Sequence, residues 1–255
     1  MKSQLFAAAF AAASSAALAT STNDILEAGS NIERPTVEAS VNYRTAKIEY
    51  GMVENDESVF GYEVEIGWYG FFGGFGTCHD MTGINDRRGR YNEIESFLGY
   101  GFSLGDFSAK AAYVYKSVFD DDESDSQEVE IELEYETPWV TPFLAIICDT
   151  SAKPGALYGE AGLHRGWEIC NHLTFVMCGG IGFGNPYHND WCFDRDRWAF
   201  REIHLGAELE IEICPHVKFI PGTDFYDYFT EAQRKVYDKF NGFIAAVGCR
   251  FAVEF

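Results

Sequence analysis

The stretch EVEIELEYE, from Glu128 to Glu136, alternates strictly between glutamate and apolar side chains. An α-helix would scatter this pattern around its circumference, whereas a β-strand sorts the two sets of side chains onto opposite faces. Val, Ile, Leu and Tyr fill the positions between the glutamates, and branched and aromatic residues favour strands. The stretch therefore predicts a β-strand with one charged face and one apolar face.

Two settings suit such a strand when it is taken alone. In a soluble β-sandwich, the glutamates would face water and the apolar row would face the core. In a transmembrane β-barrel, the apolar row would face lipid and the glutamates would face a wet lumen. The rest of the chain has to decide between these two settings.

The N-terminal sequence MKSQLFAAAFAAASSAALATST indicates export. Lys2 precedes an Ala-rich apolar run that ends in Ala-Leu-Ala, which is typical of an export signal cleaved after Ala19. No later apolar run is long enough to predict a transmembrane helix. The formal net charge of −21 excludes nucleic acid as an expected partner, because phosphate binding needs clustered Lys and Arg.

Alternating segments recur along the rest of the chain, and turn residues separate them. The segments lie at 37–43 (extending toward Met52), 60–68, 71–77, 94–104, 107–115, 128–136, 143–149, 157–163, 173–183, 203–213, 217 onward and 243–255. Short connections at 70, 105–106, 138–142, 165–171 and 214–216 alternate with longer ones at 54–58, 78–91, 119–126, 150–155, 185–199 and 224–241. This alternation is typical of the periplasmic turns and extracellular loops of an outer-membrane barrel.

The chain ends in FIAAVGCRFAVEF, which resembles the C-terminal strand signal of bacterial outer-membrane proteins. The resemblance implies that Phe251, Val253 and Phe255 are read by the barrel-insertion machinery. Together with the export signal, it favours the barrel over the sandwich. The sequence thus predicts a signal peptide at 1–19, a polar segment at 20–35, and at 36–255 an all-β fold. This fold is a single antiparallel transmembrane β-barrel of about 12 strands in the bacterial outer membrane.

Several segments together resemble the TorF family of porins. They are VNYRTAKIEYG, YEVEIGWYGFFGGFGT, YNEIESFLGYGFSLGDFSAKAAYVY, QEVEIELEY, LYGEAGLHRG and REIHLGAELEIEI. Arg44 follows Tyr43 directly, and the glycine expected beside it in that family is absent. The resemblance implies a passive outer-membrane channel, in contact with lipid, that needs no cofactor.

If the apolar rows face lipid, the opposite parity lines the lumen. The expected acidic wall consists of Glu63, Glu65, Glu93, Glu95, Glu128, Glu130, Glu132, Glu134, Glu136, Glu208, Glu210 and Glu212. The expected basic seam consists of Arg44, Lys110, Lys116 and Arg250. A wall of negative charge favours cations over anions in a pore. The alternative is that these charges only fill a polar interior, because side chains alone can nearly plug a small barrel.

The predicted function is a porin-like channel for passive diffusion of small solutes, with a preference for cations and no catalytic or metal site. A structural or adhesive barrel with a filled lumen stays open as an alternative. A barrel hydrolase would need Ser and His on one lipid-facing wall, and Ser96 has no matching His. Seven cysteines leave disulfide pairing and oligomeric state open: Cys78, Cys148, Cys170, Cys178, Cys192, Cys214 and Cys249.

Overall fold

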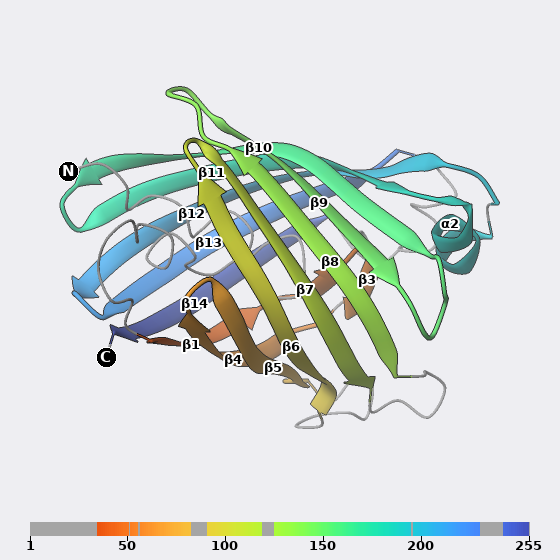
Figure 1. Cartoon of the computed structure of the whole chain (residues 1–255), viewed down its shortest axis with the longest axis horizontal. Helices are drawn as coiled ribbons and strands as arrows, with labels where there is room; N and C mark the ends of the chain where they lie inside the picture. The colour runs from red at the N-terminus through yellow and green to blue at the C-terminus, as the bar shows by residue number, and fades with distance from the viewer. Residues whose placement is uncertain are drawn as a thin grey trace.

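A computed structural model describes residues 35–50, 52–55, 57–82, 91–118, 125–194, 196–229 and 242–254. Within these ranges, twelve antiparallel strands close into one barrel (Figure 1), which confirms the predicted fold class. The expected signal peptide at 1–19, nearly all of the polar segment at 20–35, and the terminal Phe255 lie outside the described residues.

The barrel strands follow one another around the ring in chain order. They are β1 (Thr36–Arg44), β4 (Val59–Trp68), β5 (Phe71–Asp80), β6 (Tyr91–Leu104), β7 (Phe107–Val118), β8 (Ser126–Tyr135), β9 (Thr141–Asp149), β10 (Leu157–Cys170), β11 (Leu173–Gly184), β12 (Ala199–Cys214), β13 (Val217–Tyr228) and β14 (Phe243–Glu254). The first strand closes the ring, since Ser40 of β1 lies opposite Arg250 of β14 and Glu63 of β4. Closure leaves no strand edge with unpaired backbone groups.

Short turns at one end of the barrel alternate with longer connections at the other. The short turns are 69–70, 105–106, 136–140, 171–172 and 215–216. Tyr69 and Gly70 have φ of 53° and 79°, as a two-residue turn between twisted strands requires. Several expected limits are wrong by a few residues, and two connections are much shorter than expected. Strand β10 continues to Cys170 because Trp167 pairs with and stacks on Phe175 of β11. Strand β13 likewise stays paired through residues 224–228.

The two faces of the barrel wall differ in chemistry. On β8, Glu128 and Glu130 are buried, whereas Val129 and Ile131 are 38% and 41% exposed. Apolar and aromatic side chains dominate the exposed outer face, among them Trp68, Leu98, Tyr100, Tyr113, Leu163, Met177, Leu205 and Val247. In the described ranges, no helix is long and apolar enough to cross a membrane. The buried parity therefore forms the inner face, and the apolar parity forms the outer face.

Aromatic rings on one strand cover glycines on the next. Phe72 of β5 lies opposite Gly99 of β6, and Phe97 of β6 lies opposite Gly74 of β5. A Cβ atom added at Gly99 would lie 2.3 Å from Cζ of Phe72, so only glycine leaves room for the ring. Such pairs fix the register of neighbouring strands and fill the space that a glycine leaves in the wall.

The first long connection folds into the barrel. The expected extension of the first strand toward Met52 is wrong, because β1 ends at Arg44 and the chain turns inward. We call residues 45–50 the inward loop; it contains β2 (Lys47–Glu49), which pairs with β3 (Met52–Asn55). Ala46 and Ile48 are buried against Tyr226 of β13 and Ile244 of β14. Burial of these apolar side chains favours the inward path.

A short helix, α2 (Pro186–Phe193), lies in the connection between β11 and β12, at one end of the barrel (Figure 1). Asn185 caps its start by accepting a hydrogen bond of 2.9 Å from the backbone N–H of His188. Pro186 begins the helix, where a missing N–H costs nothing. His188 and Asn189 are buried, so one side of the helix packs against the barrel.

The packing of the Phe72 ring over Gly99 predicts that a larger residue at position 99 destabilises the barrel. In the Gly99→Ala variant, the new Cβ would also lie 2.6 Å from the carbonyl oxygen of Ala111, so the wall must shift. We expect the free energy of unfolding to fall by about 1 to 3 kcal/mol. It is measured by urea denaturation of the barrel in lipid vesicles. Gly76→Ala is the matched control, because its Cβ would meet nothing closer than 3.7 Å. Equal stabilities for the two variants would contradict the prediction.

Candidate functional site

Most of the expected acidic wall lies on the inner face. Its buried members on β4, β6 and β8 are Glu63, Glu65, Glu93, Glu95, Glu128, Glu130 and Glu132. Alternation along each strand turns all of them toward the interior, because their immediate neighbours point outward. Glu134, nearer the end of β8, lies 3.3 Å from Nε2 of His164.

The three expected glutamates of β12 differ in burial, and Glu136 lies outside the strands. Glu210 of β12 is buried and pairs with Lys218 at 3.2 Å. Glu208 is half-buried, as is Glu212, which lies 3.9 Å from Nδ1 of the exposed His172. Glu136 is misplaced in the expected wall, because β8 ends at Tyr135 and Glu136 is exposed in the following turn.

The expected basic residues do not form one seam. Arg44 and Arg250 lie on β1 and β14, where Nε of Arg250 pairs with Glu38 at 2.9 Å. Lys110 and Lys116 lie on β7, and strands β4, β5 and β6 separate them from β1. Lys110 is 3.8 Å from Glu132 of the neighbouring β8. The positive charges are therefore spread around the wall, and Lys110, Lys116 and Arg250 each lie beside a carboxylate.

Of the expected assembly residues, Phe251 of β14 lies on the outer face and is 43% exposed. Val253 belongs to the same strand. Phe255 lies outside the described residues, so the assembly signal stays a prediction.

The inward loop adds three polar residues that the strand pattern did not place in the interior. Lys47 pairs with Glu49 at 2.9 Å and also contacts Glu93 of β6. The hydroxyl of Tyr50 donates to Glu128 of β8 and lies 3.2 Å from Glu130. Lys47, Glu49 and Tyr50 are all buried. The loop is thereby joined to the acidic part of the wall.

Lys116 is the centre of this network. Its ammonium group contacts Glu49 of the inward loop, Glu128 at 3.2 Å and Glu95 at 3.5 Å. The same group donates to the hydroxyl of Tyr50 and lies 4.2 Å from the centre of its ring. One buried cation thus links β6, β7, β8 and the inward loop. Removing one partner from such a buried cluster is costly, because it leaves charge uncompensated.

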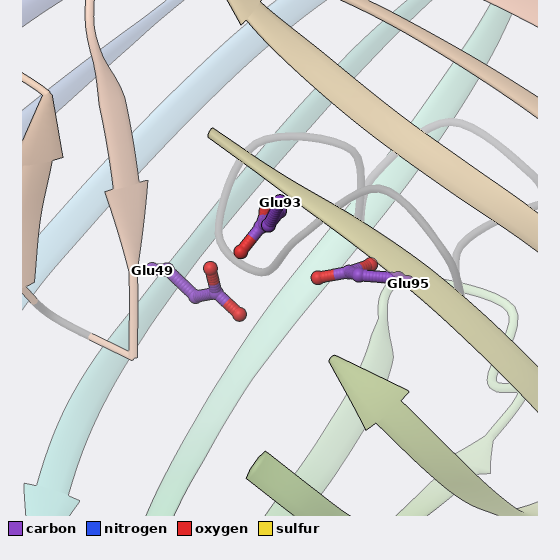
Figure 2. A group of neighbouring side chains, drawn as sticks. All are labelled: Glu49, Glu93 and Glu95. Carbon is purple, nitrogen blue, oxygen red and sulfur yellow. The ribbon is translucent and has the colours of Figure 1, made fainter. Parts of the chain in front are cut away.

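Glu49, Glu93 and Glu95 direct their carboxylates toward one point (Figure 2). One oxygen of each residue lies within 4.8 Å of the others, a spacing that could hold a metal ion. Clustered carboxylate oxygens are the ligands that hard divalent cations take. Here Lys47 and Lys116 contact the same carboxylates, so the protein supplies its own positive charge.

A small cavity of about 40 Å³ lies beside this cluster. Polar residues that line it include Arg44, Lys47, Glu63, Thr77 and Glu95. A cavity of this size, with polar side chains among its lining, has room for water or a small ion, but not for a sugar. It marks the narrow space between the inward loop and the wall of β1, β4, β5 and β6.

A second buried network anchors α2. The guanidinium of Arg201, on β12, contacts Nε2 of His188 and lies 4.6 Å from the ring centre of Phe193. Tyr158 of β10 donates a 2.6 Å hydrogen bond to Glu202. Burial, and then the neighbouring Arg201, hold the pKa of His188 well below its usual range. His188 is therefore neutral and accepts from the arginine.

The two networks meet in the interior. The rings of Tyr50 and Tyr158 lie 5.8 Å apart, and both pack against Ile147 of β9. The ring of Tyr158 also lies 5.7 Å from the ring of His188. The inward loop and α2, which come from different long connections, therefore share one packed boundary.

Comparison with known proteins finds likeness in structure alone. No protein-family model matches the chain, and no curated protein matches it. Among solved structures, the KdgM porin bound to oligogalacturonate superposes with a TM-score of 0.52 at 7% identity, covering 85% of this chain and 98% of that one. The fold is that of an outer-membrane porin.

Two further structures support this assignment of the fold. The NanC porin has a TM-score of 0.50 at 10% identity, over 84% of this chain and 98% of that one. An outer membrane channel from Pseudomonas putida F1 has a TM-score of 0.52 at 7% identity, over 88% of this chain and 97% of that one. At these identities, the likeness establishes the porin barrel and leaves function to the residues of this chain.

The central position of Lys116 predicts that its loss frees the inward loop. In the Lys116→Met variant, Glu49 and Tyr50 lose their shared cation, and breaking a buried ion pair costs about 3 to 5 kcal/mol. We expect trypsin to cleave after Lys47 about tenfold faster or more in the folded barrel. Lys218→Met is the matched control, because Lys218 pairs with Glu210 away from the loop. Unchanged cleavage at Lys47 would show that other contacts hold the loop.

The state of His188 predicts that α2 loosens in acid. A histidine with a lowered pKa in the folded state binds its proton more readily when α2 is detached. Docking is therefore fully stable above pH of about 6.5 and weakens as the pH falls below that value. Hydrogen-exchange protection of 186–193, corrected for intrinsic rates, should fall between pH 7 and 5. His188→Gln should remove most of this pH dependence, because Glu202, the other titratable group of the network, is unchanged in that variant. Equal pH dependence in the wild-type and variant proteins would refute the prediction.

Proposed function

We propose that the protein is an outer-membrane channel that passes small cations and other small polar solutes through a constriction made by the inward loop. The observation that carries this proposal is the loop itself, which crosses the interior of a porin barrel and meets its acidic wall. The porin fold supplies the passage, and the loop and the wall determine what can use it.

The contacts of the inward loop support a constriction. On one side, Ile48 packs on β13 and β14; on the other, Lys47 and Glu49 contact β6 and β7. A segment that touches both sides divides the interior into smaller passages. Their polar lining is suited to solutes that keep part of their water shell.

The balance of buried charge supports a preference for cations. Among the described residues, buried carboxylates outnumber buried Lys and Arg side chains. An excess of one sign on low-dielectric walls raises the local concentration of the opposite ion. An acidic oligosaccharide such as the oligogalacturonate bound to the KdgM porin would be repelled by this wall, so anionic sugars are not proposed as its solutes.

A structural barrel with a filled interior is the second candidate, and one observation favours it. The described cavity beside the acidic cluster is small, and the inward loop and α2 pack together across the interior. Ion conductance in a planar bilayer separates the two functions, because a filled barrel does not conduct.

A hydrolase built on Ser96 lacks support. Ser96 is exposed on the outer face of β6, and its partners across the neighbouring strands are Phe75 and Tyr115. Neither partner is able to accept its proton as a histidine would.

The cellular setting completes the proposal. An exposed apolar face around a closed barrel suits insertion in lipid, and the porin fold suits the bacterial outer membrane. Cleavage after Ala19, insertion by the barrel machinery and membership of the TorF family are part of this proposal and stay predictions.

The acidic wall of β8 provides the test. Replacing Glu130, Glu132 and Glu134 by Gln keeps their size and removes three charges. In a salt gradient across a planar bilayer, we expect the reversal potential to show less cation preference in this variant. The shift should be largest near 0.01 M salt, where the Debye length is roughly 30 Å. Glu136→Gln is the matched control, because Glu136 belongs to the same sequence ladder but is exposed in a turn.

Three outcomes of this experiment would count against the proposal. Absence of conductance in the wild-type protein favours the filled barrel. A conducting protein whose reversal potential is unchanged in the triple variant shows that the neighbouring lysines already cancel the ladder. A variant that fails to assemble would mean that the ladder serves packing.

A further inference from the structure

Three side chains on adjacent strands meet on the inner face, outside the networks described above. Sγ of Cys178, on β11, lies 3.5 Å from Nε2 of His204 on β12. Nδ1 of the same ring lies 2.9 Å from Oε1 of Glu160 on β10. All three residues are buried, with exposures of 8%, 2% and 3%. A thiol, an imidazole and a carboxylate are thus in contact in that order.

This order matches the chemistry of an activated nucleophile. A carboxylate 2.9 Å from Nδ1 stabilises positive charge on the ring, and Nε2 faces the sulfur. A base that is in contact with the nucleophile and is itself oriented by a third group is the diagnostic arrangement of nucleophilic sites. The imidazole therefore can accept the thiol proton while the carboxylate stabilises the resulting imidazolium.

The surroundings hold the imidazole in this position. The ring of Tyr226, on β13, stacks on His204 at 5.3 Å and 20° between the planes. Gly180 lies opposite His204 on β11, and a Cβ atom there would be only 2.2 Å from Oε1 of Glu160. A glycine at this position therefore leaves the space that the carboxylate occupies beside the ring.

A second thiol and imidazole contact lacks these features and serves as a comparison. Sγ of Cys192 lies 3.9 Å from Nε2 of His188, but that nitrogen also faces the guanidinium of Arg201. The lone pair is engaged by the arginine and cannot take a proton from the sulfur.

We propose that Cys178 is a base-activated thiol in the wall of the barrel and a site of covalent modification by small hydroperoxides that enter the interior. His204 is the base that contacts the sulfur, and Glu160 is the positioning residue that acts through His204. Hydroperoxides are the fitting class because they are small and uncharged, so the acidic wall does not exclude them.

The proposed reaction is a two-electron oxidation of the sulfur. The thiol proton moves to Nε2 of His204, and the sulfur attacks one peroxide oxygen. The sulfur–oxygen bond forms as the oxygen–oxygen bond breaks, and the leaving alkoxide or hydroxide takes the proton from His204. The thiol becomes a sulfenic acid, and the hydroperoxide is reduced to an alcohol or to water.

The product stays in place as a sulfenic acid. No disulfide joins Cys178 to another cysteine in the structure. Other ionisable side chains near the site include Asp224, Glu208 and Tyr226. The group formed is more polar than the thiol and projects from the inner face of the wall.

The test measures how fast each cysteine reacts in the folded, full-length barrel in lipid vesicles. Hydrogen peroxide is added, sulfenic acid is trapped with dimedone, and each cysteine is quantified by mass spectrometry. We expect Cys178 to react about tenfold faster than Cys192 or more, even though Cys178 is buried and Cys192 is only half-buried. His204→Gly should lower the rate at Cys178 about tenfold, and added imidazole should restore part of it.

Glu160 is tested through its dependence on His204. Glu160→Gln should slow the reaction at Cys178 in the wild-type background and have no further effect in the His204→Gly background. Residues that act as one unit behave in this non-additive way, whereas a general loosening of the wall would slow or speed both backgrounds equally. The rate at Cys192 within the same molecules reports any change in access.

The proposal is overturned if Cys178 of the wild-type protein reacts no faster than Cys192. This comparison needs no substitution, so it decides the question even where a variant does not fold. Equal rates at Cys178 in the wild-type and His204→Gly proteins, or no rescue by imidazole, would also overturn it.

Discussion

The pairing of β1 with both β14 and β4 is the constraint on which the rest of the structure depends. An open edge in hydrocarbon would leave backbone groups without partners, at several kcal/mol each. Closing the ring removes that cost, but it also makes every second side chain point into the same confined interior. In this chain many of those side chains are glutamates, including Glu63, Glu95 and Glu130. The buried lysines, the lysine of the inward loop and the histidine contacts all place positive or hydrogen-bonding groups beside these carboxylates.

The strands were predictable because their signal is local. Each segment shows alternation with period two. The alternation of short and long connections indicates the number of strands and the end of the barrel at which each connection lies. The inner position of Glu128, Glu130 and Glu132 follows from the same parity. The ladder extends one residue too far in sequence, because nothing in the alternation marks Tyr135 as the last paired position.

The inward loop could not be predicted in this way. Lys47 and Glu49 alternate with apolar residues just as a strand does, so the pattern reads as more of β1. What turns the loop inward is contact with Tyr226, Ile244 and Lys116, which are distant in sequence. The thiol, imidazole and carboxylate group was missed for a related reason. The expected nucleophile of a barrel hydrolase is a serine facing lipid, whereas Cys178 faces the interior, beside side chains of two neighbouring strands.

The packing of the inward loop against β13 and β14 also links the first part of the barrel to its last strands. Ala46 and Ile48 rest on Tyr226 and Ile244, so the start of the barrel is packed against its last two strands. A sheet that lacks those strands offers the loop only its polar contacts on β6, β7 and β8. The apolar contacts of the loop therefore form only when β13 and β14 are in place. Closing the wall and burying the apolar side chains of the loop thus depend on the same C-terminal strands.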